Sequence, residues 1–396
     1  MFKLLKVRSK PINILYNLSL LFLWIYPFIN IFTVTFVDGH DFSFHLWRIL
    51  ALKKEIDLGN WLPTWIADGL DGFGVPIFSI IYGVPYYTAV VLLKIGLSLP
   101  MAQKIMMFIP GPLSGLFFYI WAKNKFGKIA GGVGSIIYVW TPYHFLATFI
   151  RGTIGEIYFF MFFPLVLIFL DKTTKRLAIL AGAVSFALLI YSHNSLAFLS
   201  VFIYIGYILI TYIQAMNISQ LVKQILIIIT GILLAAFYTL PALIFPPLLH
   251  NSKIVVDDLV FPPPLSLLRS KWEGGSIIGG QNLIMSFQIG WANLIIILIS
   301  LSVIIIDFTK SKRRSINWNL LFWFGLLLLS VFMLFPISRW AWGHIPLLIN
   351  IQFPYRILAI IMIETAVLAG ILVAKIKKKS SKIKFSSIFN ITSLSW

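Results

Sequence analysis

Long apolar runs constrain this chain more than any other feature. Runs such as Ile12 to Phe36, Gln288 to Ile306 and Arg356 to Ala374 reach or approach the roughly 20 apolar residues that cross a bilayer as a helix. These runs do not alternate between apolar and polar residues, as the strands of a membrane barrel would. Only 11% of the residues are charged, against roughly 25% in an average soluble domain. The sequence therefore predicts an all-α polytopic membrane protein.

The lysines and arginines predict how the helices are threaded. The formal net charge is +19, which in a soluble protein would suggest nucleic-acid binding. Here the basic residues gather at the ends of apolar runs, as the positive-inside rule requires for cytoplasmic loops. We interpret them as topology signals and expect no nucleic-acid partner. The basic start, Met1 to Lys10, lacks an Ala-x-Ala-like site before its apolar run, which indicates an uncleaved anchor with a cytoplasmic N terminus.

This reasoning predicts about ten transmembrane helices in the cytoplasmic membrane. The predicted spans lie near 12–36, 103–122, 128–147, 157–171, 177–193, 195–214, 223–244, 289–308, 318–337 and 356–374. If the apolar run 77–97 crossed the membrane, the basic loops that follow it would lie outside. We therefore predict that this run is half-inserted or interfacial, which Pro76, Gly83 and Pro85 permit.

The domain organisation follows from these spans. Residues 1–375 are expected to form a single transmembrane domain, with a first outer loop at 37–102 and a long outer loop at 245–287. Residues 376–396 are expected to form a short basic cytoplasmic tail.

Acidic residues concentrate on the predicted outer face. They are Asp38, Asp41, Glu55, Asp57, Asp68, Asp71, Glu156, Asp257, Asp258 and Glu273. The chain has no cysteine, and its histidines show no spacing typical of a zinc site. Candidate chemistry therefore rests on carboxylates, arginines and single histidines at the outer face.

The stretch "FVDGHDFSFHLWRI" at 36–49 places several polar groups on one helical face. In a helix that starts at Asp41, His45 and Arg48 follow at i+4 and i+7, while Phe42, Leu46, Ile49 and Leu50 lie opposite. This pattern predicts an amphipathic helix at the outer membrane surface, with a carboxylate facing the cavity that it covers. Alternatively, Asp41 caps the helix while His45 and Arg48 are solvated.

Two further stretches carry polar groups at predicted outer ends. In "TPYHFLATFIRGTIGE", Arg151 and Glu156 lie near the membrane boundary, where charges are costly unless they pair or face water. They either serve a site or form a salt bridge with each other. In "YSHNS" at 191–195, His193 and Asn194 are either ligands or part of an ordinary turn.

The stretch "LLINIQFPYRILAIIMIE" at 347–364 enters the last predicted span. Gln352 and Arg356 are one helical turn apart at its outer mouth, and Glu364 lies about 12 Å deeper on helical rise. A carboxylate inside the membrane indicates either a functional site or a structural hydrogen bond between helices. Arg269 and Lys271 in the long outer loop are either phosphate ligands or solvated.

These stretches together resemble a known group of proteins. The segment from "DFSFHLWRI" to "GVPYY", followed by "TPYHFLATFIRGTIGE", "YSHNS" and "QFPYR", resembles bacterial membrane proteins labelled YfhO-like or 6-pyruvoyl-tetrahydropterin-synthase-related. The resemblance covers roughly residues 38–356 and implies kinship with the GT-C class of glycosyltransferases. It implies a GT-C-like helical bundle with juxtamembrane helices in the first outer loop. Many members are longer after "QFPYR", and nothing here supplies the zinc-binding histidines of the pterin enzyme.

The resemblance also implies roles for individual residues. Asp41 matches the first-loop acid, Glu156 the second-loop acid, and Arg151 and Arg356 the outer cations that meet a phosphate. The expected function is transfer of a sugar from a polyprenyl-phosphate donor to an envelope glycan, lipid or protein acceptor outside the membrane. Asp41 would be the base of an inverting reaction, although Asp38 could exchange roles with it. Further residues of the expected substrate site are His45, Arg48, His193, Asn194 and Gln352.

The sequence leaves cofactors and the class of function open. Glu156 could position the acceptor or, with Asp41, hold a divalent cation, and no other cofactor is predicted. The alternative function is a non-catalytic membrane transporter or a lipid- or glycan-binding protein of envelope biogenesis. Transporters often show repeated halves, and no internal repeat is visible in this sequence. A structural partner in an envelope complex that has lost activity is a third possibility.

Overall fold

The computed structural model describes residues 2–34, 37, 39–244, 259–272, 285–310 and 317–392. Within these ranges the chain is helical, apart from loops and an isolated bridge between Ile66 and Val75. Six described helices are long and apolar enough to cross a membrane, and up to nine spans result if each of three bent pairs is one span. The prediction of a polytopic helical membrane protein is confirmed.

The elements have the following bounds, with η marking short helices of other types. In chain order they are α1 (Phe2–Ile25), η1 (Tyr26–Phe32), α2 (Phe42–Asp57), α3 (Ile77–Ile80), α4 (Val84–Lys94), α5 (Leu99–Phe108), α6 (Pro110–Phe126), α7 (Lys128–Val139), α8 (Pro142–Phe145), η2 (Leu146–Arg151), α9 (Ile154–Asp171), α10 (Arg176–Ile190), α11 (Asn194–Ala215), α12 (Ile218–Leu234), α13 (Ala236–Ile244), α14 (Pro264–Leu268), α15 (Trp291–Lys310), α16 (Trp318–Met333), η6 (Pro336–Ser338), α17 (Arg339–His344), η7 (Leu348–Ile351), η8 (Pro354–Ile357) and α18 (Leu358–Thr392).

Two apolar helices form the centre of the bundle. In the most apolar windows of α9 and α18, 83% and 89% of the residues are buried, whereas the figure is 17% for α1 and for α15. The sequence of α9, "IGEIYFFMFFPLVLIFLD", is apolar on every side, as a helix surrounded by other helices requires. Side chains on the outside of α1 and α15 are apolar as well, which suits contact with lipid.

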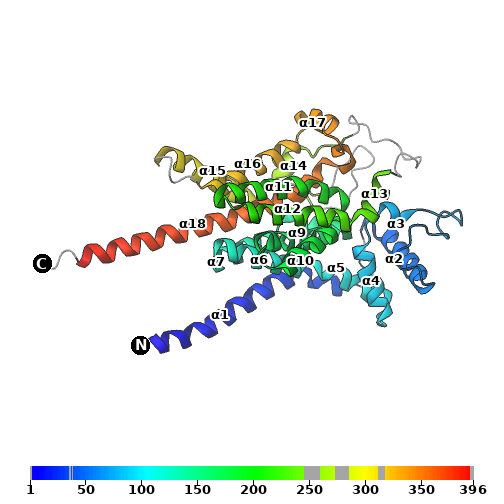
Figure 1. The fold of residues 1–396 in the computed structure, drawn as a ribbon, viewed down its shortest axis with the longest axis horizontal. Coiled ribbons are helices and arrows are strands. Elements are labelled where there is room, and N and C mark those ends of the chain that lie inside the picture. The colour runs from blue at the N-terminus through cyan, green and yellow to red at the C-terminus, as the bar shows by residue number, and fades with distance from the viewer. Residues whose placement is uncertain are drawn as a thin grey trace.

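The bundle has two chemically different ends. Both chain termini lie at one end (Figure 1), together with the basic clusters around Lys125, Lys172 and Lys375. At this basic end Lys125 pairs with Asp171 at 3.3 Å, and Lys375 pairs with Asp307. The short helices α2, α3 and α4 lie at the opposite end (Figure 1). The basic loops that we assigned to one side of the membrane therefore do share one end of the molecule.

The spans occupy the predicted positions, with two differences in form. The predicted span 177–193 corresponds to α10, an apolar helix of 15 residues that is not among the six helices and three bent pairs long enough to cross a membrane. Three spans are bent pairs, with angles of 46° between Lys128–Val139 and Pro142–Arg151, 64° between Ile218–Leu234 and Ala236–Ile244, and 94° between Trp318–Met333 and Pro336–His344.

The run 77–97 is not a membrane-spanning helix, in agreement with the prediction. It divides into α3 and α4, and α4 has only 11 residues, or about 16 Å of helix. Gly83 marks the break, and Pro85 occupies the first turn of α4, where a missing backbone N–H costs nothing.

Helix α2 forms as predicted, but it buries a different face. Its buried residues are Phe42, His45, Ile49, Leu52 and Ile56, so His45 lies among the apolar side chains rather than opposite them. The reason is that α2 packs along α4, where Tyr86 binds both His45 and Arg48. Apolar side chains such as Phe44 and Leu50 remain exposed on the other side of α2.

Parts of the predicted loops and tail can be compared with the structure. In the long outer loop 245–287 the structure shows α14, whereas 245–258 and 273–284, with Asp257, Asp258 and Glu273, lie outside the described residues. Arg269 and Lys271 are exposed, and neither is joined to the candidate site by a described hydrogen bond. Helix α18 continues beyond Lys375 to Thr392 and so includes most of the predicted tail.

Candidate functional site

Glu156 sits in the first turn of α9 because of the backbone turn before it. The π-helix η2 ends at Arg151, and Gly152 follows with φ 65°, a left-handed conformation that glycine adopts without strain. The chain thereby reverses, and Arg151 Nη1 donates a hydrogen bond of 2.8 Å to Glu156 Oε1. A carboxylate in the first helical turn is also favoured by the helix dipole. The predicted salt bridge between Arg151 and Glu156 is present.

The Glu156 carboxylate is fully buried and joins four segments of the chain. Tyr143 donates its hydroxyl proton to Oε2 at 2.8 Å. Arg356 Nε lies 3.5 Å from Oε1, and His193 Nε2 lies 3.9 Å from the same oxygen. These partners come from α8, from η8 and from the turn before α11, so the carboxylate fixes the relative positions of those segments.

His193 is both a helix cap and a member of this cluster. Its Nδ1 accepts a hydrogen bond of 3.2 Å from the Leu196 backbone N–H, which caps α11. In the neutral ring Nε2 must therefore carry the proton, and Nε2 is directed to Glu156. Burial lowers the pKa of His193 to about 3 despite the nearby carboxylate, so the ring is neutral at physiological pH. Asn194 is exposed, and its side chain accepts from Ser195 N at 2.9 Å within the same turn.

Arg356 and Gln352 meet as their spacing predicted. Arg356 Nη1 donates to the Ile351 carbonyl oxygen at 2.7 Å and lies 3.3 Å from Gln352 Oε1. The guanidinium also lies over the Phe353 ring, 5.2 Å from its centroid. Gln352 has φ 70°, a left-handed value that is strained for a residue with a Cβ, and such strain is often found at functional sites.

Asp41 occupies the N-cap position of α2 but does not cap it with its side chain. Its carboxylate is half-buried and makes no hydrogen bond or ion pair with other residues in the described part of the chain. The capping interpretation is therefore not supported. Asp38, the predicted substitute for Asp41, lies outside the described residues.

His45 and Arg48 are held by one tyrosine. Tyr86 lies 2.8 Å from His45 Nδ1 and accepts a hydrogen bond of 3.1 Å from Arg48 Nη1. Because the tyrosine oxygen accepts from Arg48, its own proton is available to His45 Nδ1. Burial lowers the pKa of His45 to about 3, so this ring is neutral and already hydrogen-bonded. The interpretation of His45 as a solvated residue is wrong, whereas Arg48 is partly exposed and bound to Tyr86.

The two groups of residues face the same region. Asp41 interacts electrostatically with Tyr82, Tyr86 and Tyr355, and Tyr82 also interacts with Glu156. The structure thus brings together most of the predicted site residues, namely Asp41, His45, Arg48, Arg151, Glu156, His193, Gln352 and Arg356. Among them are three arginines and two acids, so the cluster carries an excess of positive charge that favours an anion.

Four tyrosines of the site were not identified from the sequence. They are Tyr82, Tyr86, Tyr143 and Tyr355. Tyr143 binds Glu156, and the ring of Tyr355 lies 5.0 Å from the Arg151 guanidinium. Tyr143 and Tyr355 fall inside "TPYHF" and "QFPYR", two of the stretches that carry the family resemblance. Their position in these stretches could have identified them as site residues. Tyr82 and Tyr86 also fall inside the quoted segment that ends in "GVPYY", but nothing there set them apart, because tyrosine is common wherever helices meet the membrane surface.

The described residues include no group of three or more histidine, aspartate and glutamate side chains that could hold a metal ion. Both oxygens of Glu156 already accept hydrogen bonds, from Arg151 and from Tyr143. A divalent cation held by Asp41 and Glu156 stays a prediction.

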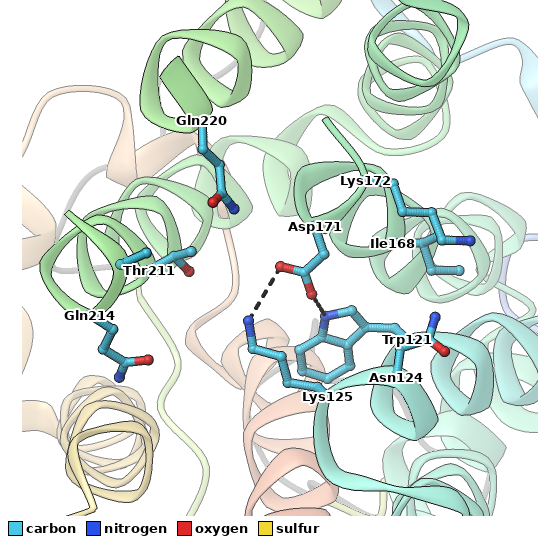
Figure 2. Close-up of a pocket in the computed structure, with 10 residues that line it drawn as sticks. Trp121, Asn124, Lys125, Ile168, Asp171, Lys172, Thr211, Gln214 and Gln220 are labelled. Atoms are coloured by element: carbon cyan, nitrogen blue, oxygen red, sulfur yellow. Dashed lines mark hydrogen bonds and ion pairs between the residues drawn. The ribbon is translucent and has the colours of Figure 1, made fainter. Parts of the chain in front are cut away.

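A pocket of about 450 Å³ lies at the basic end, away from this site. It is lined by residues of α6, α9, α11 and α12 (Figure 2). Figure 2 shows the Asp171 carboxylate at its centre, with the Lys125 amine and the Trp121 indole directed to it at 3.3 and 3.2 Å. Tyr207 also donates to Asp171, at 2.7 Å, so this carboxylate ties three helices together.

Glu364 belongs neither to the candidate site nor to the pocket around Asp171. Ser330 on α16 donates to Glu364 Oε1 at 2.9 Å, so the predicted hydrogen bond between helices is present. Its other oxygen is buried and has no hydrogen-bond partner among the described residues.

The fold defines a polytopic helical membrane protein. Among solved structures, the chain is similar to the apo form of the oligosaccharyltransferase of Archaeoglobus fulgidus, with a TM-score of 0.51 and 13% sequence identity. The likeness covers 89% of this chain and 50% of that one, so this chain spans about half of the length of that protein. No protein-family model matches the sequence, and no curated protein matches it. The likeness at this identity concerns the fold, and membership of the YfhO-like group stays a prediction.

Proposed function

We propose that this protein is a membrane glycosyltransferase of the YfhO-like group, moving a sugar from a polyprenyl-phosphate donor to an envelope acceptor. The reaction would take place at the outer face of the cytoplasmic membrane, on the end of the bundle opposite the basic loops. The observation that carries the proposal is the Asp41 carboxylate, half-buried and unpaired among described residues, beside a cluster with more arginines than acids. A GT-C-like fold supports the proposal at the level of architecture.

The arginines differ in their suitability as phosphate ligands. The Arg356 side chain is 13% exposed, and its Nη1 shares its hydrogen bonds with a backbone carbonyl and an exposed glutamine. Arg48 is partly buried and donates to Tyr86. Arg151 is only 5% exposed and is engaged by Glu156, so it would support the site by holding that carboxylate. Arg356 and Arg48 are therefore the cations that would meet the donor phosphate.

The proposed reaction is a direct displacement. The acceptor hydroxyl attacks the anomeric carbon, its oxygen forms the new glycosidic bond, and the bond from that carbon to the phosphate oxygen breaks. Polyprenyl phosphate leaves with the bonding electron pair, and Asp41 takes the hydroxyl proton. A single displacement inverts the anomeric carbon. His45 and His193 are neutral and hydrogen-bonded, so Asp41 is better suited than either to act as the base.

The test is a transfer assay in liposomes with a panel of polyprenyl-phosphate sugars. Asp41→Asn is expected to lower turnover about 100-fold or more, as loss of a general base usually does. Asp68→Asn is the matched control, because Asp68 lies in the same outer loop but pairs with Lys54 at the surface. Unchanged turnover in Asp41→Asn would show that the base assignment is wrong.

A non-catalytic transporter or a lipid- or glycan-binding protein is the second candidate. The pocket around Asp171 favours it, since a cavity of about 450 Å³ within the bundle suits binding of a substrate away from the candidate site. Uptake of a sugar or lipid into proteoliposomes, with no transfer product from any donor, would establish this alternative. Product formation without uptake would exclude it.

A further inference from the structure

Tyr82 occupies the space between the two halves of the candidate site. It lies between α3 and α4 and interacts electrostatically with Arg48 and Asp41 of the first outer loop and with Glu156 of the bundle. Its ring stacks on Tyr86, which binds Arg48, and on His193, whose Nε2 lies 3.9 Å from Glu156 Oε1. Its position therefore depends on how the loop is docked onto the bundle.

The Tyr82 ring is fixed on both faces. It stacks on His193 with centroids 5.6 Å apart and on Tyr86 with centroids 5.9 Å apart, at interplanar angles of 25° and 10°. One edge lies against Gly155, where an added Cβ would come within 2.5 Å of Tyr82 Cζ. A side chain at position 155 would collide with the Tyr82 ring. Glycine at this position therefore allows the ring to lie against the N-terminal turn of α9.

The hydroxyl of Tyr82 has an unused proton. The Tyr82 Cζ atom lies against Gly155 in the first turn of α9, where backbone N–H groups have no partner within their own helix. No hydrogen bond from Tyr82 to another side chain is found in the described ranges. Burial raises the pKa of Tyr82 to about 12, so the hydroxyl keeps its proton at neutral pH. A hydrogen-bond donor is thus available close to Asp41, Arg48 and Glu156, which all act electrostatically on Tyr82.

An anionic oxygen is the acceptor that suits this place. The start of an 18-residue helix is favourable for negative charge, and Arg48, which binds the neighbouring Tyr86, adds a cation nearby. A sugar hydroxyl would gain less here, because a hydrogen bond to a charged oxygen is about twice as strong as one between neutral groups.

We propose that the Tyr82 hydroxyl donates a hydrogen bond to a phosphate oxygen of the lipid-linked donor, next to Arg48. This inference rests on the proposed function, since it names a further residue that contacts its substrate. The hydrogen bond would strengthen as the sugar departs, because the phosphate oxygen that leaves gains negative charge. Tyr82 would then contribute to turnover as well as to binding.

The test compares two probes, farnesyl phosphate and farnesol, for binding to the detergent-purified full chain. Tyr82→Phe keeps the stacked ring and removes only the hydroxyl. It is expected to weaken farnesyl phosphate binding about 10-fold or more, as loss of a hydrogen bond to a charged group does, and to leave farnesol binding unchanged. Tyr87→Phe is the matched control, because the Tyr87 hydroxyl donates to the Trp61 carbonyl oxygen in the outer loop at 2.7 Å.

The outcomes separate this inference from the proposed function. If native protein prefers farnesyl phosphate and Tyr82→Phe binds it equally well, the role of Tyr82 is overturned while the phosphate-binding function stands. If native protein shows no preference for the phosphate probe, both are overturned. Inorganic phosphate is the third probe: if it binds as tightly as farnesyl phosphate and loses affinity in Tyr82→Phe, the hydrogen bond is supported but its lipid-linked source is overturned.

Discussion

Glu156 shows how a single buried charge organises this protein at the scale of residues. A carboxylate with no exposure is tolerable only because two arginines and a tyrosine surround it. Removing the charge would leave Arg151 and Arg356 buried without their counterion. The same carboxylate therefore supports both the fold and the position of the cations that face the proposed substrate.

The first prediction concerns this ion pair. Glu156→Gln is expected to lower the free energy of unfolding by about 3–5 kcal/mol, because it breaks a buried pair and strands the partner charges. Thermal and denaturant unfolding in detergent would measure the loss. Asp57→Asn is the control, since Asp57 pairs with Lys53 at the surface and its loss is expected to change stability little. Equal effects of the two substitutions would contradict the prediction.

The second prediction concerns the two neutral histidines. The pKa values of His45 and His193 are lowered to about 3 in the folded protein, whereas an unfolded histidine titrates near 6.5. Between these values the unfolded chain binds more protons, so stability is expected to fall as the pH drops from about 6.5 toward 3. Each histidine contributes up to about 1.4 kcal/mol per pH unit in this window.

Unfolding measured at pH 7, 6, 5 and 4 would show this slope. His193→Asn keeps a side chain that can cap α11, and it is expected to reduce the slope by the contribution of this one histidine. A slope that is identical in native protein and in this variant would show that His193 is protonated in the folded state or exposed to water.

At the scale of elements, the first outer loop is docked on the bundle through backbone contacts. Gly83 N and Val84 N both donate to the Tyr191 carbonyl oxygen, at 3.1 and 3.2 Å. Tyr191 belongs to the turn that carries His193, so this contact places the loop residues against the buried cluster. The close approach is possible because Gly83 has no side chain, and an added Cβ would lie 2.1 Å from the Tyr191 hydroxyl oxygen.

The third prediction follows from this contact. Gly83→Ala is expected to displace the α3–α4 segment from the bundle and to expose the outer loop to protease. Gly325→Ala in α16 is the matched control, because nothing lies within 4 Å of its added Cβ and alanine favours a helix. Limited proteolysis with identification of the cut sites would compare the two. Equal resistance of both variants would indicate that the loop tolerates the extra atom.

Hydropathy and charge were sufficient to predict the elements, whereas the contacts between them were not accessible from the sequence. Apolar runs mark the spans because the bilayer demands them, and Gly83 with Pro85 marked the broken run 77–97. The short spacing between Arg151 and Glu156 allowed their salt bridge to be predicted. The sequence could not show that Arg356, some 200 residues later, shares the same carboxylate. It also misplaced His45, because which face of α2 is buried depends on α4.

At the scale of the whole molecule, charge divides the bundle into two ends. The basic clusters share the end with both termini, and the candidate site occupies the other end (Figure 1). The chain has no cysteine, so single cysteines can report the orientation without any background.

The fourth prediction is the orientation itself. A membrane-impermeant maleimide added to intact cells is expected to label Leu58→Cys in the first outer loop and to spare Ser219→Cys at the basic end. Permeabilised cells should show labelling of both. The reverse pattern would place the candidate site in the cytoplasm and would contradict a reaction at the outer face.

Two helices that lead into the site are short for a membrane crossing. Helix α9 has 18 residues and α10 has 15, which correspond to about 27 and about 22 Å, against about 30 Å of hydrocarbon. The apolar side chains of Leu177, Leu180 and Val184 on α10 are exposed, so this short helix borders the lipid. The bilayer is expected to thin beside it, and a lipid phosphate there would reach the depth of the arginines without leaving its leaflet. If the proposed transfer takes place, its rate should then depend on acyl-chain length, so that the thickness of the surrounding membrane would control the activity.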